Sequence, residues 1–369
     1  MIRYEYESQG RLVRHLYFLD ELDIGSFEDE IASCDELAIF YTKKMSRAIE
    51  SKYGQALIYM SKGSNWNTPN HSIMIDLTKS GQEILNGFHK NRRYKVRRAL
   101  EKDHFVTNIF LNPVIDKLKE AGCFYDYFAR EKGMPNFDIE RYAAACRAGC
   151  FMLASIRDED GDLLVQNGYL LDDDHKISTF AFGASHFRTD TGKAALIGRA
   201  NGCLHYKVML YLKEMGYMGF DFGGLYIGDD EGLTNISNFK RGFGGEIRTY
   251  SPKIIFQKKD YENVEHNIVA IKRVAAGKNI IIWGMGTWGK YVASRIYEVY
   301  GTKPGCLIDS CISDDPDIQK PDILSRYSPH DSYLIVATRR VQYEEIIKNK
   351  MVQSFTESNS ILCIREELL

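Results

Sequence analysis

The chain has 369 residues, of which 44% are hydrophobic and 27% are charged, and its formal net charge is −2. This length and composition are those of an ordinary soluble protein with two or three domains, each large enough for its own core. The charge provides no general field that would draw the protein to DNA or to an anionic membrane surface, so any basic site has to be local.

The eight cysteines do not form a disulfide or metal framework. None belongs to a CxxC pair, and the nearest neighbours, Cys146 with Cys150 and Cys306 with Cys311, have no histidines at zinc-site spacing. We therefore expect reduced thiols, no metal site and a cytoplasmic protein. The N-terminus is charged from its third residue and no apolar run has the length of a membrane helix, so we expect neither a signal peptide nor a membrane span.

The first loop of interest covers residues 62–70. It separates two short apolar runs, residues 56–60 and 72–76, which we predict to be strands. The loop carries Trp66, which would either line a cleft or anchor a surface loop through one aromatic ring.

A strongly basic helix is predicted over residues 80–102. Six of the ten residues from His89 to Arg98 are Lys or Arg. At about 100° per residue, Arg92 and Lys95 fall in the same arc as the apolar side chains of the helix. Because an unpaired charge on a packing surface is costly, these two cations need a partner. The partner is either an anionic group such as a phosphate in a cleft or an internal salt bridge.

An antiparallel meander is predicted in the middle of the chain, followed by a polar loop, a helix and one more strand. This order is typical of an α+β fold rather than of alternating strands and helices. The acidic runs DEDGD and DDDH between the meander strands lack the spacing and the terminal Glu of a calcium loop, so turn chemistry explains them better than a metal site. The strands cover residues 150–156, 163–171, 176–182 and 217–222, the loop 183–192 and the helix 193–215.

The stretch from 217 to 250 carries two glycine clusters on either side of a basic pair. Glycine permits positive φ and lets a ligand approach backbone amides closely, so an acidic strand end, a loop and a Lys-Arg pair between glycine turns suggest a site. The alternative is a polar loop with two tight turns. The residues concerned are Asp221, Gly223, Gly224, Lys240, Arg241, Gly242, Gly244 and Gly245.

Three motifs in this part of the chain resemble those of FemAB-like acyltransferases of the GNAT fold. They are a basic helix (HKNRRYKVRRALEK, residues 89–102), a strand that ends in DFGG (residues 221–224) and the element FKRGFGG (residues 239–245). They follow one another in the family's order over roughly residues 55–256. The resemblance implies an α+β fold of paired GNAT units, with residues 1–115 as a degenerate first half and 116–260 as the acyltransferase half.

The resemblance also implies transfer of an acyl or aminoacyl group to an amine or hydroxyl. In such folds the amides at the start of a helix bind the donor's phosphates, and Gly192 and Lys193 stand at that point. The leading cation of an ordinary CoA-binding loop is missing, so acyl-CoA and aminoacyl-tRNA both stay open as the donor. Asp221 is the first candidate to orient or deprotonate the acceptor and His186 is the second, the alternatives being a turn-capping Asp and a surface His. The substrate-binding candidates are Arg92, Lys95, Trp66, Lys240, Arg241 and Gly244.

A separate small α/β domain is predicted over residues 268–369. Its first strand runs into GMGTWG and then a helix, which is the order of a dinucleotide-binding motif. Gly284, Gly286 and Gly289 form this motif, and Asp309 closes the next strand, where an acidic residue would bind a ribose. The domain resembles the small Rossmann-like modules of surface-sugar enzymes, including sugar N-acetyltransferases. That resemblance implies a nucleotide or nucleotide-sugar ligand, or only a docking or dimerisation role.

Taken together, these patterns predict a cytoplasmic acyltransferase that acts on an amino sugar or a similar precursor of a surface polysaccharide. Its partners would be a small-molecule or nucleotide-sugar substrate and, with an aminoacyl donor, a charged tRNA, but not DNA. No pattern indicates an oligomeric state. The alternative is a non-catalytic subunit that senses a nucleotide or serves as a scaffold.

Overall fold

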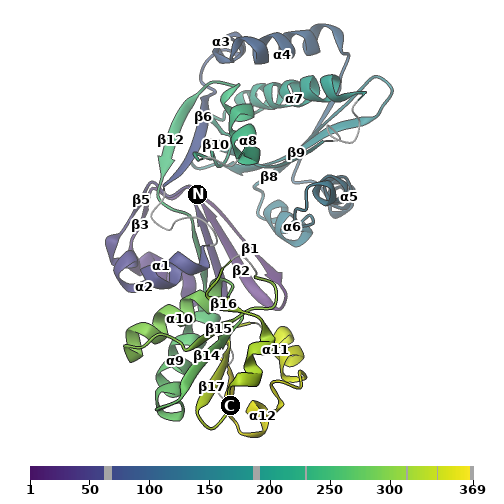
Figure 1. Cartoon of the computed structure of the whole chain (residues 1–369). Coiled ribbons are helices and arrows are strands. Elements are labelled where there is room, and N and C mark those ends of the chain that lie inside the picture. Colours follow the sequence, from purple (N-terminus) through teal and green to yellow (C-terminus); the bar gives the residue numbers. More distant parts are fainter. Residues whose placement is uncertain (62–68, 186–191, 229–230, 313–314, 339, 366–369) are drawn as a thin grey trace. The chain divides into compact units, whose positions relative to one another are not determined.

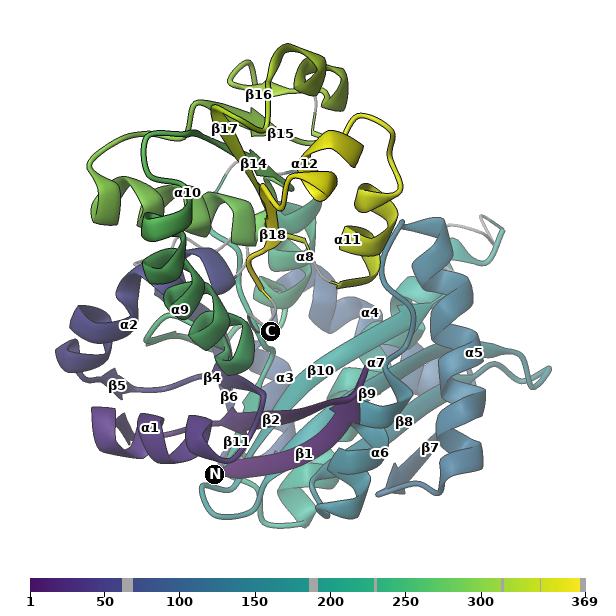
Figure 2. The same cartoon turned by 90° about the horizontal axis from the view of Figure 1, so that it is seen from below.

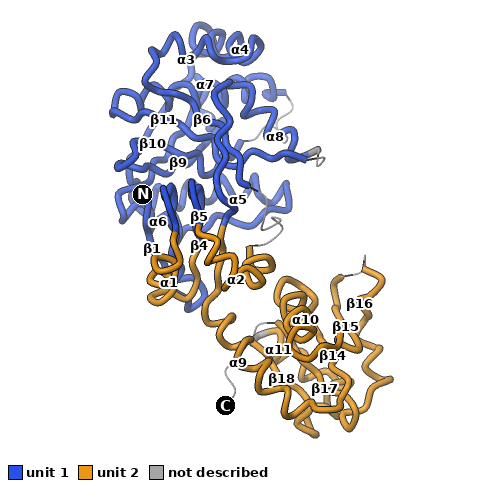
Figure 3. The backbone as a smooth tube through the Cα atoms, turned by 90° about the vertical axis from the view of Figure 1, so that its left-hand side faces the viewer, with its two compact units in different colours: residues 1–22, 38–45, 68–253 blue, residues 23–37, 46–67, 254–369 orange. Residues whose placement is uncertain are grey.

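The chain folds into two compact units, and both are assembled from separate segments (Figure 3). Unit 1 comprises residues 1–22, 38–45 and 68–253, and unit 2 comprises residues 23–37, 46–67 and 254–369. The structure is a computed structural model (Figure 1), and it describes residues 1–61, 69–185, 192–228, 231–312, 315–338 and 340–365.

A seven-stranded sheet forms the centre of unit 1, with the strand order β12-β6-β11-β10-β9-β8-β7. Neighbouring strands are antiparallel except β10 and β11, which are parallel. A parallel pair needs a crossover, and helix α7 (Ala194–Glu214) supplies it. The strands are β6 (Asn70–Asp76), β7 (Val106–Leu111), β8 (Phe151–Arg157), β9 (Leu163–Asp172), β10 (Ile177–Ser185), β11 (Gly219–Asp221) and β12 (Glu246–Tyr250).

Both faces of this sheet are covered. One face packs against α3 (Gly81–Gly87), α4 (Lys90–Lys102), α7 and α8 (Glu231–Arg241), around a core that includes Val96, Leu204 and Phe220. The other face packs against β1 (Ile2–Ser8), β2 (Arg11–Tyr17), α5 (Ile115–Glu131) and α6 (Ile139–Arg147), around a core that includes Tyr142 and Phe182. Figure 2 is viewed from this second side, with β1 and β2 in front of the sheet and α3 and α4 behind it. Since successive side chains of a strand point to opposite faces, β11 sends Phe220 to the first core and Asp221 to the other side.

The predicted meander, the long helix after it and the strand at residues 217–222 are confirmed by β8, β9, β10, α7 and β11. The single helix predicted over residues 80–102 is instead two helices, because Phe88 is extended (φ −69°, ψ 146°) and turns its ring edge-on to Tyr206 and Phe243. The first helix begins with a capping box between Ser80 and Glu83.

Two other local predictions are wrong. Residues 56–60 are not a strand but the last turns of α2 (Arg47–Met60), whose buried residues Ile49, Tyr53 and Leu57 recur with helical spacing. The stretch after the first glycine cluster contains α8, although it was predicted to be a loop. After β12 the chain continues through β13 (Ile254–Gln257) into α9 (Lys258–Val274).

Unit 2 is built on a five-stranded parallel sheet with the order β16-β15-β14-β17-β18. The first strand along the chain is central, and later strands are added on one side and then on the other, so that a topological switch point lies between β14 and β17. The elements are β14 (Asn279–Trp283), α10 (Thr287–Tyr300), β15 (Cys306–Ile308), β16 (Ile318–Gln319), η1 (Pro321–Arg326), β17 (Ser332–Val336), α11 (Arg340–Ile347), α12 (Gln353–Glu357) and β18 (Ile361–Cys363).

Two segments from the N-terminal part of the chain complete unit 2. They carry α1 (Ile24–Ala32) and α2, and the rings of Phe27 and Tyr53 contact Phe256 edge-on at centroid distances of 5.6 and 5.4 Å. Strand β4 (Glu36–Phe40) crosses the division between the units, and β3 (Glu21–Leu22) and β5 (Lys44–Met45) form a short parallel pair in unit 1. Among the helices of the described residues, none has both the length and the apolar character that crossing a membrane requires.

Candidate functional site

A buried carboxyl group lies at the end of β11. The strand turns at Gly223, whose φ is +66° and where a Cβ atom would come within 2.8 Å of the carbonyl oxygen of Phe180, so only glycine fits. The side chain of Asp221 has no exposed surface and accepts hydrogen bonds from Gly223 N (2.7 Å), Ser72 Oγ and Tyr250 Oη (3.3 Å). The aspartate therefore organises the glycine turn, and a second strand and a tyrosine hold it in place.

Lys240 reaches the same turn from the last turn of α8. It is 8% exposed, and its Nζ donates to the carbonyl oxygens of Gly223 (3.1 Å) and Gly224 (2.5 Å). Asp221 thus accepts from the amide of Gly223 while Lys240 donates to its carbonyl. Gly223 therefore connects the two ionisable groups, one through its N–H and the other through its carbonyl.

Burial shifts the pKa values of Asp221 and Lys240 toward 7, from below and from above respectively. It raises the pKa of Asp221 to about 6, although the hydrogen bonds from Ser72, Gly223 and Tyr250 and the charge of Lys240 act in the opposite direction. Burial lowers the pKa of Lys240 to about 8, and the nearby Asp221 opposes that shift. A carboxyl and an amine whose pKa values lie on either side of 7 can exchange protons at physiological pH.

Two further groups at this turn had no signal in the sequence. Ser72 lies in β6, and Tyr41 stacks edge-on against Tyr250 at 5.2 Å with a backbone φ of +57°. Burial and the charge of Asp221 raise the pKa of the Tyr41 phenol. Local sequence patterns could not identify Ser72 as a partner of Asp221, because the two residues are far apart in the chain. Only the pairing of β6 with β11 brings them together.

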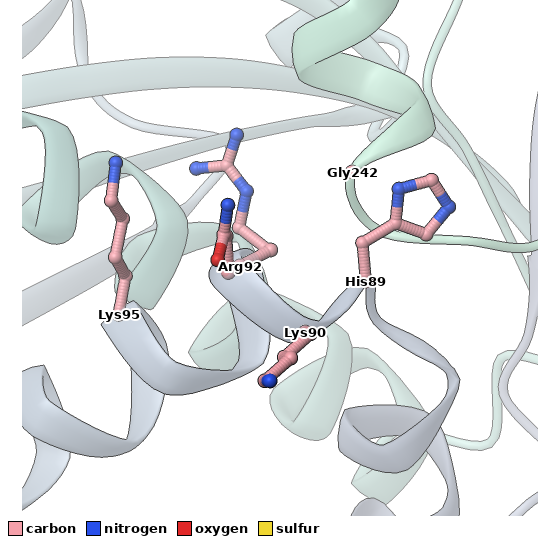
Figure 4. Close-up of a pocket in the computed structure, with 6 residues that line it drawn as sticks. His89, Lys90, Arg92, Lys95 and Gly242 are labelled. Atoms are coloured by element: carbon pink, nitrogen blue, oxygen red, sulfur yellow. The ribbon is translucent and has the colours of Figure 1, made fainter.

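An open pocket of about 480 Å³ lies at the start of α4, and its lining is cationic (Figure 4). The side chains of Arg92 and Lys95 extend from α4 on the same side, but only Arg92 is partly buried, so the predicted place on the packing surface is wrong for the exposed Lys95. The backbone of Gly242 also lines the pocket, and its carbonyl accepts from His89 N, at the start of α4, at 3.0 Å. The lining residues are His89, Lys90, Asn91, Arg92, Lys95 and Gly242.

Arg92 is held by aromatic rings rather than by a carboxylate. Its guanidinium carbon lies 4.2 Å from the ring centre of Phe239 and 4.6 Å from that of Phe243, and Nη2 donates to the carbonyl of Phe239 at 3.4 Å. Its Nε is buried without a hydrogen-bond partner among the described residues, and burial lowers its pKa to about 10. Neither Arg92 nor the exposed Lys95 forms an ion pair with a described residue, so the predicted alternative of an internal salt bridge is not found there.

Glycines make room for this arginine. A Cβ atom at Gly202 or Gly242 would come within 3.2 or 3.3 Å of a guanidinium nitrogen of Arg92. Gly244, at φ +70°, has no room for a side chain either, because its Cβ would lie 2.3 Å from the carbonyl oxygen of Gly87. The second glycine cluster is thus shaped to lie against α4 and the turn before it.

The other residues predicted for the site are spread out. Trp66 and His186 lie outside the described residues. Lys193 pairs with Asp158 (2.9 Å) and Asp162 (2.6 Å), which raises its pKa, and no side chain in the described part of the chain caps the start of α7 beside it. The remaining two, Gly192 and Arg241, are respectively exposed and half-buried.

The glycine motif of unit 2 forms the turn between β14 and α10. Gly284 has φ +99°, and a Cβ at Gly289 would lie 2.1 Å from its carbonyl oxygen, while Gly286 is open and precedes the helix. The carboxylate of Asp309 accepts from Met285 N at 2.8 Å and so ties the glycine turn to the end of β15. At the switch point, the hydroxyl of Thr338 is buried without a hydrogen-bond partner among the described residues.

Nowhere in the described part of the chain do three or more His, Cys, Asp or Glu side chains come together as metal ligands. No protein-family model matches the chain, and no curated protein matches its sequence.

Similar folds are found among solved structures at low sequence identity. A crystal structure of FemX is 14% identical, with a TM-score of 0.48 over 71% of this chain and 90% of that chain. L-PGS from Bacillus licheniformis is 12% identical, with a TM-score of 0.39 over 74% and 85% of the two chains. A tandem GNAT protein from the clavulanic acid biosynthesis pathway is 11% identical, with a TM-score of 0.33 over 60% and 62%. At such distances, conclusions about function depend on the residues of the site itself.

Proposed function

We propose that the protein is an acyltransferase that moves an acyl or aminoacyl group to an amine or hydroxyl of a sugar or another cell-envelope precursor in the cytoplasm. The observation that carries this proposal is the pair at the end of β11, Asp221 with a pKa of about 6 and Lys240 with a pKa of about 8. A general base works best when its pKa lies near the operating pH. Acyl transfer to an amine or hydroxyl needs such a group to take the proton of the attacking atom.

The two groups have complementary roles in this proposal. As the acceptor nitrogen or oxygen bonds to the acyl carbon, its proton passes to the Asp221 carboxylate through the hydroxyl of Tyr250, which hydrogen-bonds to Asp221. Lys240 uses two of its three N–H groups on the carbonyls of Gly223 and Gly224, which leaves one for the oxyanion that forms on the acyl oxygen. The donor's leaving group takes up a proton as the intermediate collapses.

The fold proposed for this chemistry is GNAT-like, with residues 1–115 as a degenerate first half and 116–260 as the catalytic half. Its support is the parallel pair β10–β11 in an otherwise antiparallel sheet, joined by α7. Among the described residues no side chain caps the start of α7, so its amides are suited to donor phosphates near Gly192 and Lys193. Acyl-CoA and aminoacyl-tRNA both carry such phosphates.

Arg92 and Lys95 are proposed to hold an anionic part of a substrate in the open pocket at the start of α4. The support is chemical: a guanidinium with no carboxylate partner among the described residues, a second cation on the same side of the helix and an accessible volume of about 480 Å³. Phosphate is the anion that suits such a cluster best.

Unit 2 is proposed to be a Rossmann-like domain that binds a nucleotide or nucleotide-sugar. Its support is the glycine turn at Gly284, Gly286 and Gly289 beside the switch point of a parallel sheet, together with the unpartnered hydroxyl of Thr338. Asp309 already accepts a hydrogen bond from the glycine turn, so any contact with a ribose uses its remaining acceptor capacity. The same features favour a second candidate function, a non-catalytic subunit that senses a nucleotide.

Mass spectrometry separates the two candidates. The purified protein is incubated with candidate UDP-sugars and either acetyl-CoA or charged tRNA, and an acyltransferase increases the mass of one acceptor by the acyl group. A sensing subunit leaves every acceptor mass unchanged and is stabilised by a nucleotide in a thermal-shift assay. No stabilisation by any nucleotide contradicts the ligand site of unit 2.

A further inference from the structure

A second guanidinium without a carboxylate partner lies on the opposite face of the sheet of unit 1. Arg141, in α6, donates from Nε to Tyr4 Oη (3.2 Å) and from Nη2 to Tyr17 Oη (2.7 Å), and its guanidinium lies 5.2 Å from the ring centre of Tyr142. The described residues provide neither an ion pair to Arg141 nor a hydrogen bond to its Nη1. The side chain as a whole is half-buried.

The groups around Arg141 do not neutralise it. His15 lies against the two phenols, at 3.2 Å from Tyr4 Oη and 3.4 Å from Tyr17 Oη. Burial and the charge of Arg141 lower the pKa of His15 far below its usual value, and burial raises that of Tyr4, so both are neutral at pH 7. Of the two acidic residues at the start of this helix, Asp138 caps it and accepts from Tyr6 at 3.4 Å, and Glu140 is exposed.

This cluster therefore carries one net positive charge among aromatic rings. Leaving a charge uncompensated in such surroundings is costly, and the two phenols orient the guanidinium without removing its charge. An arrangement of this kind is useful to a protein when an anion completes it.

We propose that Arg141, with the hydroxyls of Tyr4 and Tyr17, binds a carboxylate group of a ligand. The single positive charge matches a monoanion, and the free edge of a planar guanidinium matches the two oxygens of a carboxylate. A phosphate dianion is better served by the pocket at the start of α4, where Lys90, Arg92 and Lys95 gather. The two faces of the sheet thus select different anions.

The cluster is connected to the buried pair by a row of aromatic rings in tilted and edge-on contact. Tyr17 lies 6.3 Å from Tyr41, Tyr41 lies 5.2 Å from Tyr250, and Tyr250 donates to Asp221. Assigning the bound carboxylate to the acceptor or to an aminoacyl group rests on the proposed function. The binding of a carboxylate does not, because it requires neither a donor nor transfer.

Ligand-observed NMR titrations with three small probes test this inference. Phenylacetate is the carboxylate, phenylacetamide is its neutral counterpart and phenyl phosphate is the competing anion. We expect phenylacetate to bind the full-length protein at least about 10-fold more tightly than phenylacetamide. Arg141→Gln should weaken phenylacetate about 10- to 100-fold, since a hydrogen bond to a charged group is lost. The matched control is Arg147→Gln, which removes an exposed arginine from the same helix and should change nothing.

Tyr17→Phe keeps the test decisive if Arg141→Gln does not fold. It leaves the charge in place but removes one orienting hydroxyl, and we expect phenylacetate to bind about 2- to 10-fold more weakly. Phenylacetate binding that is unchanged in both variants would overturn the site. Phenyl phosphate that binds as tightly, with the same dependence on Arg141, would overturn the carboxylate assignment. Transfer activity measured separately by mass spectrometry shows whether the proposed function fails or survives independently.

Discussion

The buried pair and the open pocket of unit 1 differ in access but share one segment. Asp221 and Lys240 are 0% and 8% exposed, whereas the pocket beside Arg92 is open and about 480 Å³ in volume. Lys240 points to the glycine turn at the end of β11, while its neighbours Phe239 and Phe243 hold Arg92. A few residues therefore contribute both to the buried pair of ionisable groups and to the open cationic pocket. Under the proposed function, changes at the first should affect turnover and changes at the second should affect binding.

The largest effect is expected from Asp221→Asn. The amide has the same shape and still accepts from Gly223 and Ser72, but it takes no proton from the acceptor. We expect kcat to fall about 100-fold or more at saturating acceptor, with little change in KM. Full turnover in this variant, measured by the mass assay, would show that Asp221 is a structural turn residue only.

A stability measurement shows whether this loss reflects misfolding. The folded-state pKa of Asp221 is raised to about 6, so ionising the buried carboxyl costs the folded state up to about 3 kcal/mol at pH 7. Below the unfolded pKa the carboxyl is protonated in both states and the cost vanishes. Asp221→Asn should thus be at least as stable as the unmodified protein in urea at pH 7, and this advantage should disappear near pH 4.

Substitution of Arg92 tests the open pocket. Arg92→Gln removes the guanidinium that lies on Phe239 and Phe243, and we expect the affinity for inorganic phosphate or the KM of a phosphate-bearing substrate to worsen about 10- to 100-fold at similar kcat. Arg98→Gln, which removes an exposed arginine from the same helix, is the matched control. If only the unfolding free energy changed and not the affinity, Arg92 would be a packing residue.

The pH dependence of kcat sharpens the role of the pair. A base with a pKa of about 6 is active when deprotonated, so kcat should rise about tenfold per pH unit below 6 and level off above it. If transfer also needs the Lys240 ammonium, kcat should fall again above about pH 8. A profile that lacks the acidic limb would exclude Asp221 as the base, whatever the activity of the Asn variant.

The smallest effect is expected at Lys95. This side chain is exposed and shares the pocket with Arg92 without packing against an aromatic ring, so Lys95→Gln should weaken phosphate binding about two- to fivefold and increasingly less at high salt. Lys102→Gln, at the far end of α4, serves as the control. If Lys95→Gln and Lys102→Gln weakened phosphate binding equally, the effect would come from the overall positive charge of α4 and not from a local contact with Lys95.

Local patterns predicted much of this fold but not its long-range pairings. The meander, α7, the strand before the glycine turn and the motif after β14 all have clear periodicity or turn residues. Arg92 and Lys95 both line the open pocket, but the spacing did not show that Lys95 is exposed. Ser72, Tyr41 and Arg141 were missed, because each reaches its partners through strand pairing or packing between distant segments. The break at Phe88 was missed as well, since an edge-on contact with Phe243 determines it.

The assembly of unit 2 has a consequence for how the chain is synthesised. Residues 23–37 and 46–67 belong with residues 254–369, so α2 cannot place Tyr53 against Phe256 until nearly all of unit 1 has left the ribosome. Until then, one face of an early helix stays exposed and depends on delayed partners or chaperones. A truncation before β13 would leave that face of α2 exposed in the finished protein. Residues 254–369 therefore cannot be removed without loss of the core that they form with residues 23–37 and 46–67.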